Sequence, residues 1–227
     1  MLRYETFADV RLGGGGFNCG SVASTRDHAP PKVFLDEPYP DNIIKVASCA
    51  ACNESASLDE QYVACLIEAT LRGSTDPDDL QRSKIARTLR RDPALRSKLA
   101  RAKFDVDGYI AFQPESDRVS RVLTKMARGL WYFEHAEAPT DMETICRWWT
   151  APLSPAAEAE FFRTSSLQGW PEIGSRAFVR ACRGLVDSTH SSGWLELQEG
   201  RFSYSTDDGR VRMILSDYLY VDALMDA

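Results

Sequence analysis

The chain has 227 residues, of which 44% are hydrophobic and 26% are charged, and its formal net charge is −6. Such a composition is typical of a folded globular protein and excludes a disordered, collagen-like or coiled-coil chain. No apolar run approaches the roughly 18 residues that span a bilayer, and the first residues contain no apolar signal core. We therefore expect a cytoplasmic protein with no membrane partner.

The first predicted helix follows a zone that is rich in glycine, proline and aspartate. Residues 1–57 show few helical signals, so we expect loops and hairpins there. Apolar residues then recur at helical spacing over residues 57–72, and Gly73 follows them. Ser57 and Glu60 have the spacing of a capping box. The pattern predicts an amphipathic helix over residues 57–72.

A second helical stretch carries most of the positive charge. It runs over residues 80–91, is interrupted by Asp92-Pro93, and resumes to about residue 103. Residues 82–103 hold nine basic residues against Asp92 alone. A further helix is predicted from Ser116 to Arg128, ending at Gly129. Weaker helical patterns follow near residues 141–149, 154–166 and 174–187.

The C-terminal part changes to β-prone runs. The runs WLELQ, RFSYS, RMIL and YLYVDA are separated by turn signals at Glu199-Gly200 and Asp208-Gly209. They predict a small antiparallel sheet. Together with the preceding helices, this pattern places the protein in the α+β class.

The cysteines are the first residues with chemical potential. Cys49 and Cys52 form a C-x-x-C motif, which in a reducing compartment favours a metal knuckle or a redox pair over a structural disulfide. We expect the thiols of the last three cysteines to be buried in helical surroundings; these are Cys65, Cys146 and Cys182.

Other chemical residues surround this motif in a fixed order: Asp27-His28, then Asn42, then Cys49, Cys52 and Asn53. In this order and spacing, residues 16–62 resemble the HNH nucleases of the ββα-metal fold. The matching subtype has the motif C-x-x-C, DH-x-P, N and C-x-x-C-N. The stretches GLWYFEH and RMILSDYLYVDA also resemble the C-terminal parts of bacterial HNH proteins.

The resemblance implies metal-dependent hydrolysis of DNA. His28 would be the general base, since an imidazole accepts a proton near neutral pH. Asp27 and Asn53 would bind one catalytic Mg²⁺ or Mn²⁺ through their oxygen atoms. Asn42 would hold the loop that carries the base. Without the resemblance, turn hydrogen bonds would explain Asp27 and Asn42, and a role at the start of a helix would explain Asn53.

The sequence departs from the family at its first zinc position, where Gly16 replaces a cysteine. Cys19, Cys49 and Cys52 would hold a structural Zn²⁺ with water or another side chain as the fourth ligand. The alternative is that the missing thiolate abolishes zinc binding.

The basic stretch is a second candidate for contact with nucleic acid. Lysine and arginine bind phosphates without regard to base sequence, and the predicted contacts are Arg87, Arg90, Arg91 and Lys98. The alternative is a solvated charged face of a helix.

These observations predict an HNH ββα-metal module over residues 1–72. A mainly helical body with C-terminal antiparallel strands would occupy residues 73–227. The predicted function is metal-dependent endonuclease activity on DNA. The alternative is a degenerate HNH or zinc-knuckle module that binds nucleic acid or a protein partner without cleavage. A zinc-stabilised interaction module with no role on nucleic acid is a third hypothesis, and a homodimer is compatible with each.

Overall fold

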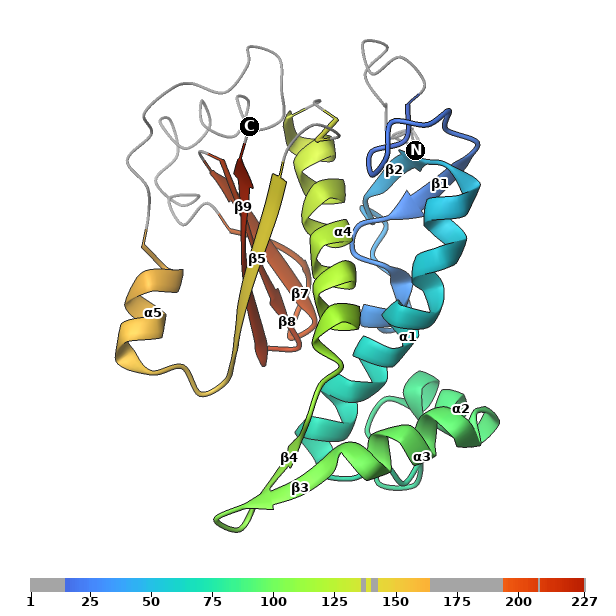
Figure 1. The fold of residues 1–227 in the computed structure, drawn as a ribbon, viewed down its shortest axis with the longest axis vertical. Helices are drawn as coiled ribbons and strands as arrows, with labels where there is room; N and C mark the ends of the chain where they lie inside the picture. The colour runs from blue at the N-terminus through green and yellow to red at the C-terminus, as the bar shows by residue number, and fades with distance from the viewer. Residues whose placement is uncertain (1–14, 136–137, 140–142, 164–193, 208, 227) are drawn as a thin grey trace.

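The structure, a computed structural model, describes residues 15–135, 138–139, 143–163, 194–207 and 209–226 (Figure 1). It contains helices and antiparallel sheets, which confirms the α+β class. No helix in these ranges is both long and apolar enough to cross a membrane. The elements are β1 (Thr25–His28), η2 (Lys32–Phe34), β2 (Lys45–Ser48), α1 (Ala50–Arg72), α2 (Ser83–Arg91), α3 (Pro93–Ala102), β3 (Lys103–Val106), β4 (Tyr109–Phe112), α4 (Ser116–His135), β5 (Glu143–Thr150), α5 (Pro155–Phe161), β6 (Leu195–Gln198), β7 (Phe202–Asp207), β8 (Arg210–Leu215) and β9 (Leu219–Asp226).

The N-terminal zone is a β-hairpin followed by a helix. β1 pairs antiparallel with β2, and the register places His28 opposite Lys45. α1 begins at Ala50, earlier than predicted, because the thiol of Cys49 accepts a hydrogen bond from the backbone N–H of Cys52 and caps the helix. The predicted capping box is wrong, since Ser57 lies inside α1 and donates to the carbonyl of Glu54.

The predicted interruption between the two basic helices is confirmed. The side chain of Asp92 accepts a hydrogen bond from the N–H of Leu95, and Pro93 is the first residue of α3. A short hairpin that the sequence analysis missed follows directly. Its strands β3 and β4 are joined by Asp107 and Gly108, which have φ values of 52° and 84°.

Helix α4 continues past Gly129 to His135, so the predicted end at Gly129 is wrong. A Cβ atom at Gly129 would lie 3.0 Å from the Cβ of Ala29, the residue after His28. The glycine therefore allows α4 to approach the loop that follows β1. In Figure 1, α4 runs between the hairpin with α1 on one side and the larger sheet on the other.

The larger sheet has five antiparallel strands in the order β5-β9-β8-β7-β6. Strands β6 to β9 confirm the predicted C-terminal sheet, and Gly200 and Gly209 have the positive φ that the tight turns require. The predicted helix near residues 141–149 is wrong, because Glu143–Thr150 forms β5 and pairs with β9. Cys146 therefore lies on a strand, not on a helix.

The other two weak helical predictions have different outcomes. The helix predicted near residues 154–166 is the shorter α5, which Ser154 caps by accepting a hydrogen bond from the N–H of Ala157. The helix predicted near residues 174–187 lies outside the described residues, as does Cys182.

One hydrophobic core connects the hairpin, the helices and the larger sheet. It contains Phe17 before the hairpin, Tyr62 on α1, Met126 on α4 and Val221 on β9. The core is therefore continuous across residue 72, where the sequence predicted a boundary between two parts.

Candidate functional site

The two faces of the β1–β2 hairpin have different surroundings. Side chains alternate along a strand, so Arg26 and His28 share one face with Lys45, the cross-strand partner of His28. Asp27 lies on the opposite, packed face and is only 5% exposed. Asp27 and His28 are neighbours in the sequence, but they therefore lie in different environments.

His28 is half-buried, and its Nε2 atom is buried without a hydrogen-bond partner among the described residues. Burial lowers the pKa of His28, and the nearby charges of Lys32 and Lys45 lower it further, although Asp27 acts in the opposite direction. The lowered pKa favours the neutral imidazole at pH 7, which is the form that can accept a proton.

Two lysines, Lys32 and Lys45, lie close enough to act on the charge of this histidine, and Arg26 shares its face of the hairpin. All three cations are exposed and none forms an ion pair with a residue in the described ranges, although Lys32 lies 5.1 Å from the centre of the Tyr39 ring. We call these three residues and His28 the His28 face. Because no carboxylate neutralises these cations, they are available to bind an anion such as a phosphate.

Asp27 is engaged on both of its oxygen atoms. Its Oδ1 accepts a hydrogen bond from the backbone N–H of His28 at 2.7 Å, and its Oδ2 lies 2.5 Å from Nζ of Lys125 on α4. The same ammonium lies 2.6 Å from Oε1 of Glu60 on α1. Burial alone would lower the pKa of Lys125, but its contacts with the carboxylates of Asp27 and Glu60 raise it, so the lysine remains charged.

The two predicted asparagines lie apart from this ion pair. Asn53 is in the first turn of α1, where its Nδ2 donates to Oγ1 of Thr25 at 3.3 Å. Asn42 is exposed in a turn before β2, and its side chain makes no hydrogen bond to a described residue. Asn53 therefore bonds at the end of the hairpin away from His28, and no hydrogen bond or ion pair joins it to Asp27 within the described part of the chain.

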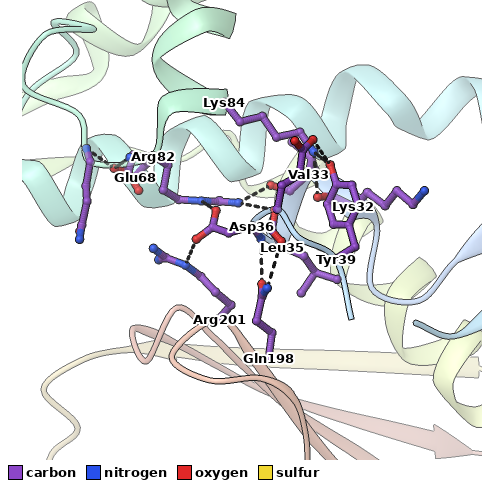
Figure 2. A network of polar contacts seen from close by, with 12 residues as sticks. Lys32, Val33, Leu35, Asp36, Tyr39, Glu68, Arg82, Lys84, Gln198 and Arg201 are labelled. Carbon is purple, nitrogen blue, oxygen red and sulfur yellow. Dashed lines mark hydrogen bonds and ion pairs between the residues drawn. The ribbon is translucent and has the colours of Figure 1, made fainter. Parts of the chain in front are cut away.

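The loop between His28 and β2 is fixed by Asp36 (Figure 2). The Asp36 carboxylate lies 2.7 Å from Nε of Arg82, which is buried at the start of α2, and 2.5 Å from Nε of Arg201 in the β6–β7 turn. The side chain of Gln198 accepts from the N–H of Asp36 and donates to its carbonyl. The loop after His28 is thereby tied to two distant elements.

Arg82 and Lys84 extend this network to the backbone of the loop. Arg82 donates to the carbonyls of Val33 and Leu35, and Lys84 donates to the carbonyl of Lys32 and to the Tyr39 hydroxyl. The sequence analysis missed this network, because Arg82 and Arg201 lie 46 and 165 residues from Asp36 in the chain. No local sequence pattern signals such a contact.

The structure also gathers three cysteines into a group that can hold a metal ion. The sulfur atoms of Cys19, Cys49 and Cys52 all lie within 4.8 Å of one another, and those of Cys19 and Cys49 are 3.6 Å apart. Zn–S bonds of about 2.3 Å in a tetrahedron give sulfur separations of about 3.8 Å. Hydrogen bonds from the Ser21 side chain and backbone lower the pKa of Cys19 to about 7, which favours its thiolate form, whereas burial raises the pKa of Cys52 to about 11.

Gly16 explains in steric terms why a fourth cysteine is absent from this group. A Cβ atom on Gly16 would lie 3.0 Å from the backbone nitrogen of Cys49 and 3.4 Å from the carbonyl oxygen of Ser21. Any side chain at this position would push against the start of α1. A fourth metal ligand would therefore be water or another side chain.

The basic helices are partly neutralised within the molecule. Of the four predicted phosphate contacts, Arg90 pairs with Asp78 at 2.5 Å and Lys98 pairs with Glu115 at 2.8 Å. Arg87 and Arg91 are exposed and form no ion pair with any residue that the structure describes. Of the four predicted contacts, these two have no competing carboxylate among the described residues.

Comparison with known proteins gives no match: no family model, no curated protein and no solved structure is similar to this chain. A functional interpretation therefore depends on the geometry above and on the sequence motif.

Proposed function

We propose that the chain is an HNH-type endonuclease that binds a phosphodiester of DNA on the His28 face. The observation that carries this proposal is the position of His28 beside Lys32 and Lys45, which form no ion pair with any residue that the structure describes, while burial and these two charges lower the pKa of the imidazole. The order β1, β2, α1 supports it, since strand, strand and helix in that order are what the ββα-metal fold requires.

The proposed chemistry is hydrolysis with a water nucleophile. The imidazole of His28 takes a proton from water, the water oxygen attacks phosphorus, and the bond from phosphorus to the leaving oxygen breaks. The leaving oxygen takes a proton from solvent. Lys32 and Lys45 would bind the non-bridging oxygens, on which negative charge accumulates in the transition state.

The Mg²⁺ or Mn²⁺ that the resemblance implies does not fit Asp27 in this arrangement. One oxygen of Asp27 is occupied by the N–H of His28 and the other by the ammonium of Lys125. The proposed mechanism therefore has no step through an ion at Asp27. At the other end of the hairpin, we propose that Cys19, Cys49 and Cys52 hold a structural Zn²⁺ that fixes the start of α1.

A second candidate function is binding of nucleic acid without cleavage. The contact between Asp27 and Lys125 favours it, because a divalent ion usually supplies much of the transition-state stabilisation in phosphodiester hydrolysis. In this case Arg87, Arg91 and the His28 face would bind nucleic acid, and no cleavage would follow.

A paired cleavage and binding assay distinguishes the two functions. Wild-type protein and His28→Ala would be incubated with end-labelled duplex and single-stranded DNA, with binding measured by fluorescence anisotropy on the same samples. The endonuclease proposal expects His28→Ala to bind DNA but not cut it. Binding by both proteins without cleavage by either would support the second function, and absence of binding would contradict both.

A further inference from the structure

Three elements of the fold meet at a single buried ammonium group. Lys125 Nζ on α4 lies 2.5 Å from Asp27 Oδ2 on β1 and 2.6 Å from Glu60 Oε1 on α1. The side chains of Lys125, Asp27 and Glu60 are only 7%, 7% and 12% exposed. We propose that Lys125 is the resident cation of this junction, so that Asp27 binds no divalent ion in the folded protein.

The oxygen atoms of Asp27 are the first reason why this carboxylate binds no divalent ion. A magnesium ion requires near-octahedral coordination at about 2.0–2.1 Å and usually keeps several of its water molecules. Asp27 has one oxygen bonded to the N–H of His28 and the other to Lys125. It also lies on the packed face of β1 and is only 5% exposed, so its carboxylate is shielded from a hydrated ion in solution.

The position of Lys125 on a buried helix is the second reason. Its helix neighbours Val122 and Met126 are fully buried core residues, and Gly129 on the same helix lies against Ala29. The backbone that carries the ammonium is thus fixed in the core, and the Lys125 side chain is only 7% exposed. A divalent ion would therefore have to displace a charge that is attached to the central helix of the fold.

Substitution of Lys125 should change metal binding at this junction. In Lys125→Met the side chain keeps a similar length and loses its charge, which leaves the carboxylates of Asp27 and Glu60 facing one vacated point. Two carboxylates beside each other repel unless a cation lies between them. We expect this variant to gain a site for a hard divalent ion such as Mn²⁺.

Titration with Mn²⁺, followed by electron paramagnetic resonance on zinc-loaded protein, tests the inference without measuring activity. Wild-type protein and Asp27→Asn are expected to bind Mn²⁺ equally weakly. Lys125→Met should gain one Mn²⁺ site, which should disappear in Lys125→Met/Asp27→Asn. Lys103→Met removes an exposed charge on β3 and serves as the control.

A Mn²⁺ site in the wild-type protein that is lost in Asp27→Asn would overturn the inference. The absence of a new site in folded Lys125→Met would also overturn it, since the junction would then not be a cation position. If Lys125→Met does not fold, the comparison of wild type with Asp27→Asn still decides. A Mn²⁺ site at Asp27 would overturn the ion-free form of the proposed mechanism, whereas the role of His28 in cleavage is tested separately by His28→Ala, so the two failures are distinguishable.

Discussion

At the scale of single residues, the proton affinity of His28 sets the expected pH dependence. Burial and the charges of Lys32 and Lys45 place the pKa of His28 below its ordinary value of 6.5. The base form then predominates at pH 6.5 and above, so the cleavage rate should fall to half of its plateau only at a pH below 6.5. A rate profile on a labelled oligonucleotide measures this, and a fall that begins near pH 8 would exclude His28 as the base.

The unpaired lysines of the His28 face predict salt-dependent binding. Lys45→Ala should weaken DNA binding for all sequences and reduce the slope of log affinity against log salt by about 1. Lys103→Ala is the matched control, because it removes an equally exposed lysine from the distant β3–β4 hairpin (Figure 1). Equal effects of the two substitutions would show that binding depends only on overall charge.

The types of residue at the site were predictable from the sequence, but their partners were not. The motif identified His28 and the cysteines, because the spacing of such residues is visible along the chain. The partner of Asp27 was not visible, since Lys125 belongs to a helix that appeared only as an amphipathic pattern. Glu60 likewise has the spacing of a capping residue, yet it binds Lys125, 65 residues away.

At the scale of elements, the loop after His28 depends on Asp36. Asp36→Ala would leave the guanidinium of Arg82, which is 3% exposed, without its carboxylate. Removal of one partner of a buried ion pair lowers the free energy of unfolding by about 3 kcal/mol or more. Because Asp36 itself is 36% exposed, we expect the lower end of that range. Asp41→Ala is the control, since Asp41 is exposed in the same loop.

The contribution of Asp36 should also depend on pH. Burial alone would raise the pKa of Asp36, but hydrogen bonds from Arg82 and Arg201 lower it below 3.8. The stabilisation is therefore complete above pH 3.8 and is lost as the pH falls through the lower value of the folded state. Urea unfolding at neutral and acid pH measures both effects. Equal stability of Asp36→Ala and wild type at neutral pH would contradict this role of the network.

Sequence patterns predicted most helices and strands, but they failed where a tertiary contact determines the secondary structure. β5 contains Ile145, Trp148 and Trp149, residues that favour strands, but its spacing also resembled a helix. The pairing of β5 with β9 resolves the ambiguity, and that strand lies far along the chain. Gly129 was predicted to end the helix, but its missing side chain instead allows α4 to approach Ala29 closely.

At the scale of the whole molecule, the three-cysteine group joins the segment before the hairpin to the start of α1. The reduced protein is expected to bind one Zn²⁺, and chelation should lower its thermal stability, because a bound ion stabilises the folded state. Cys19→Ser should weaken Zn²⁺ binding, whereas Cys146→Ser on β5 should not. Equal zinc affinity of both variants and wild type would contradict the assignment of this group.

The packing of the chain around α4 determines the surroundings of both His28 and Asp27. The continuous core holds the hairpin against α4, so that Asp27 faces Lys125 and His28 lies on the opposite face of the hairpin. Our central claim is that His28 and the neighbouring lysines act on a phosphodiester without an ion at Asp27.

Plasmid nicking by zinc-loaded protein in a buffer depleted of Mg²⁺ and Mn²⁺ tests this claim most directly. The account predicts that wild-type protein and Asp27→Asn nick the plasmid at similar rates and that His28→Ala does not. Nicking that requires added Mg²⁺ and is abolished by Asp27→Asn would contradict it.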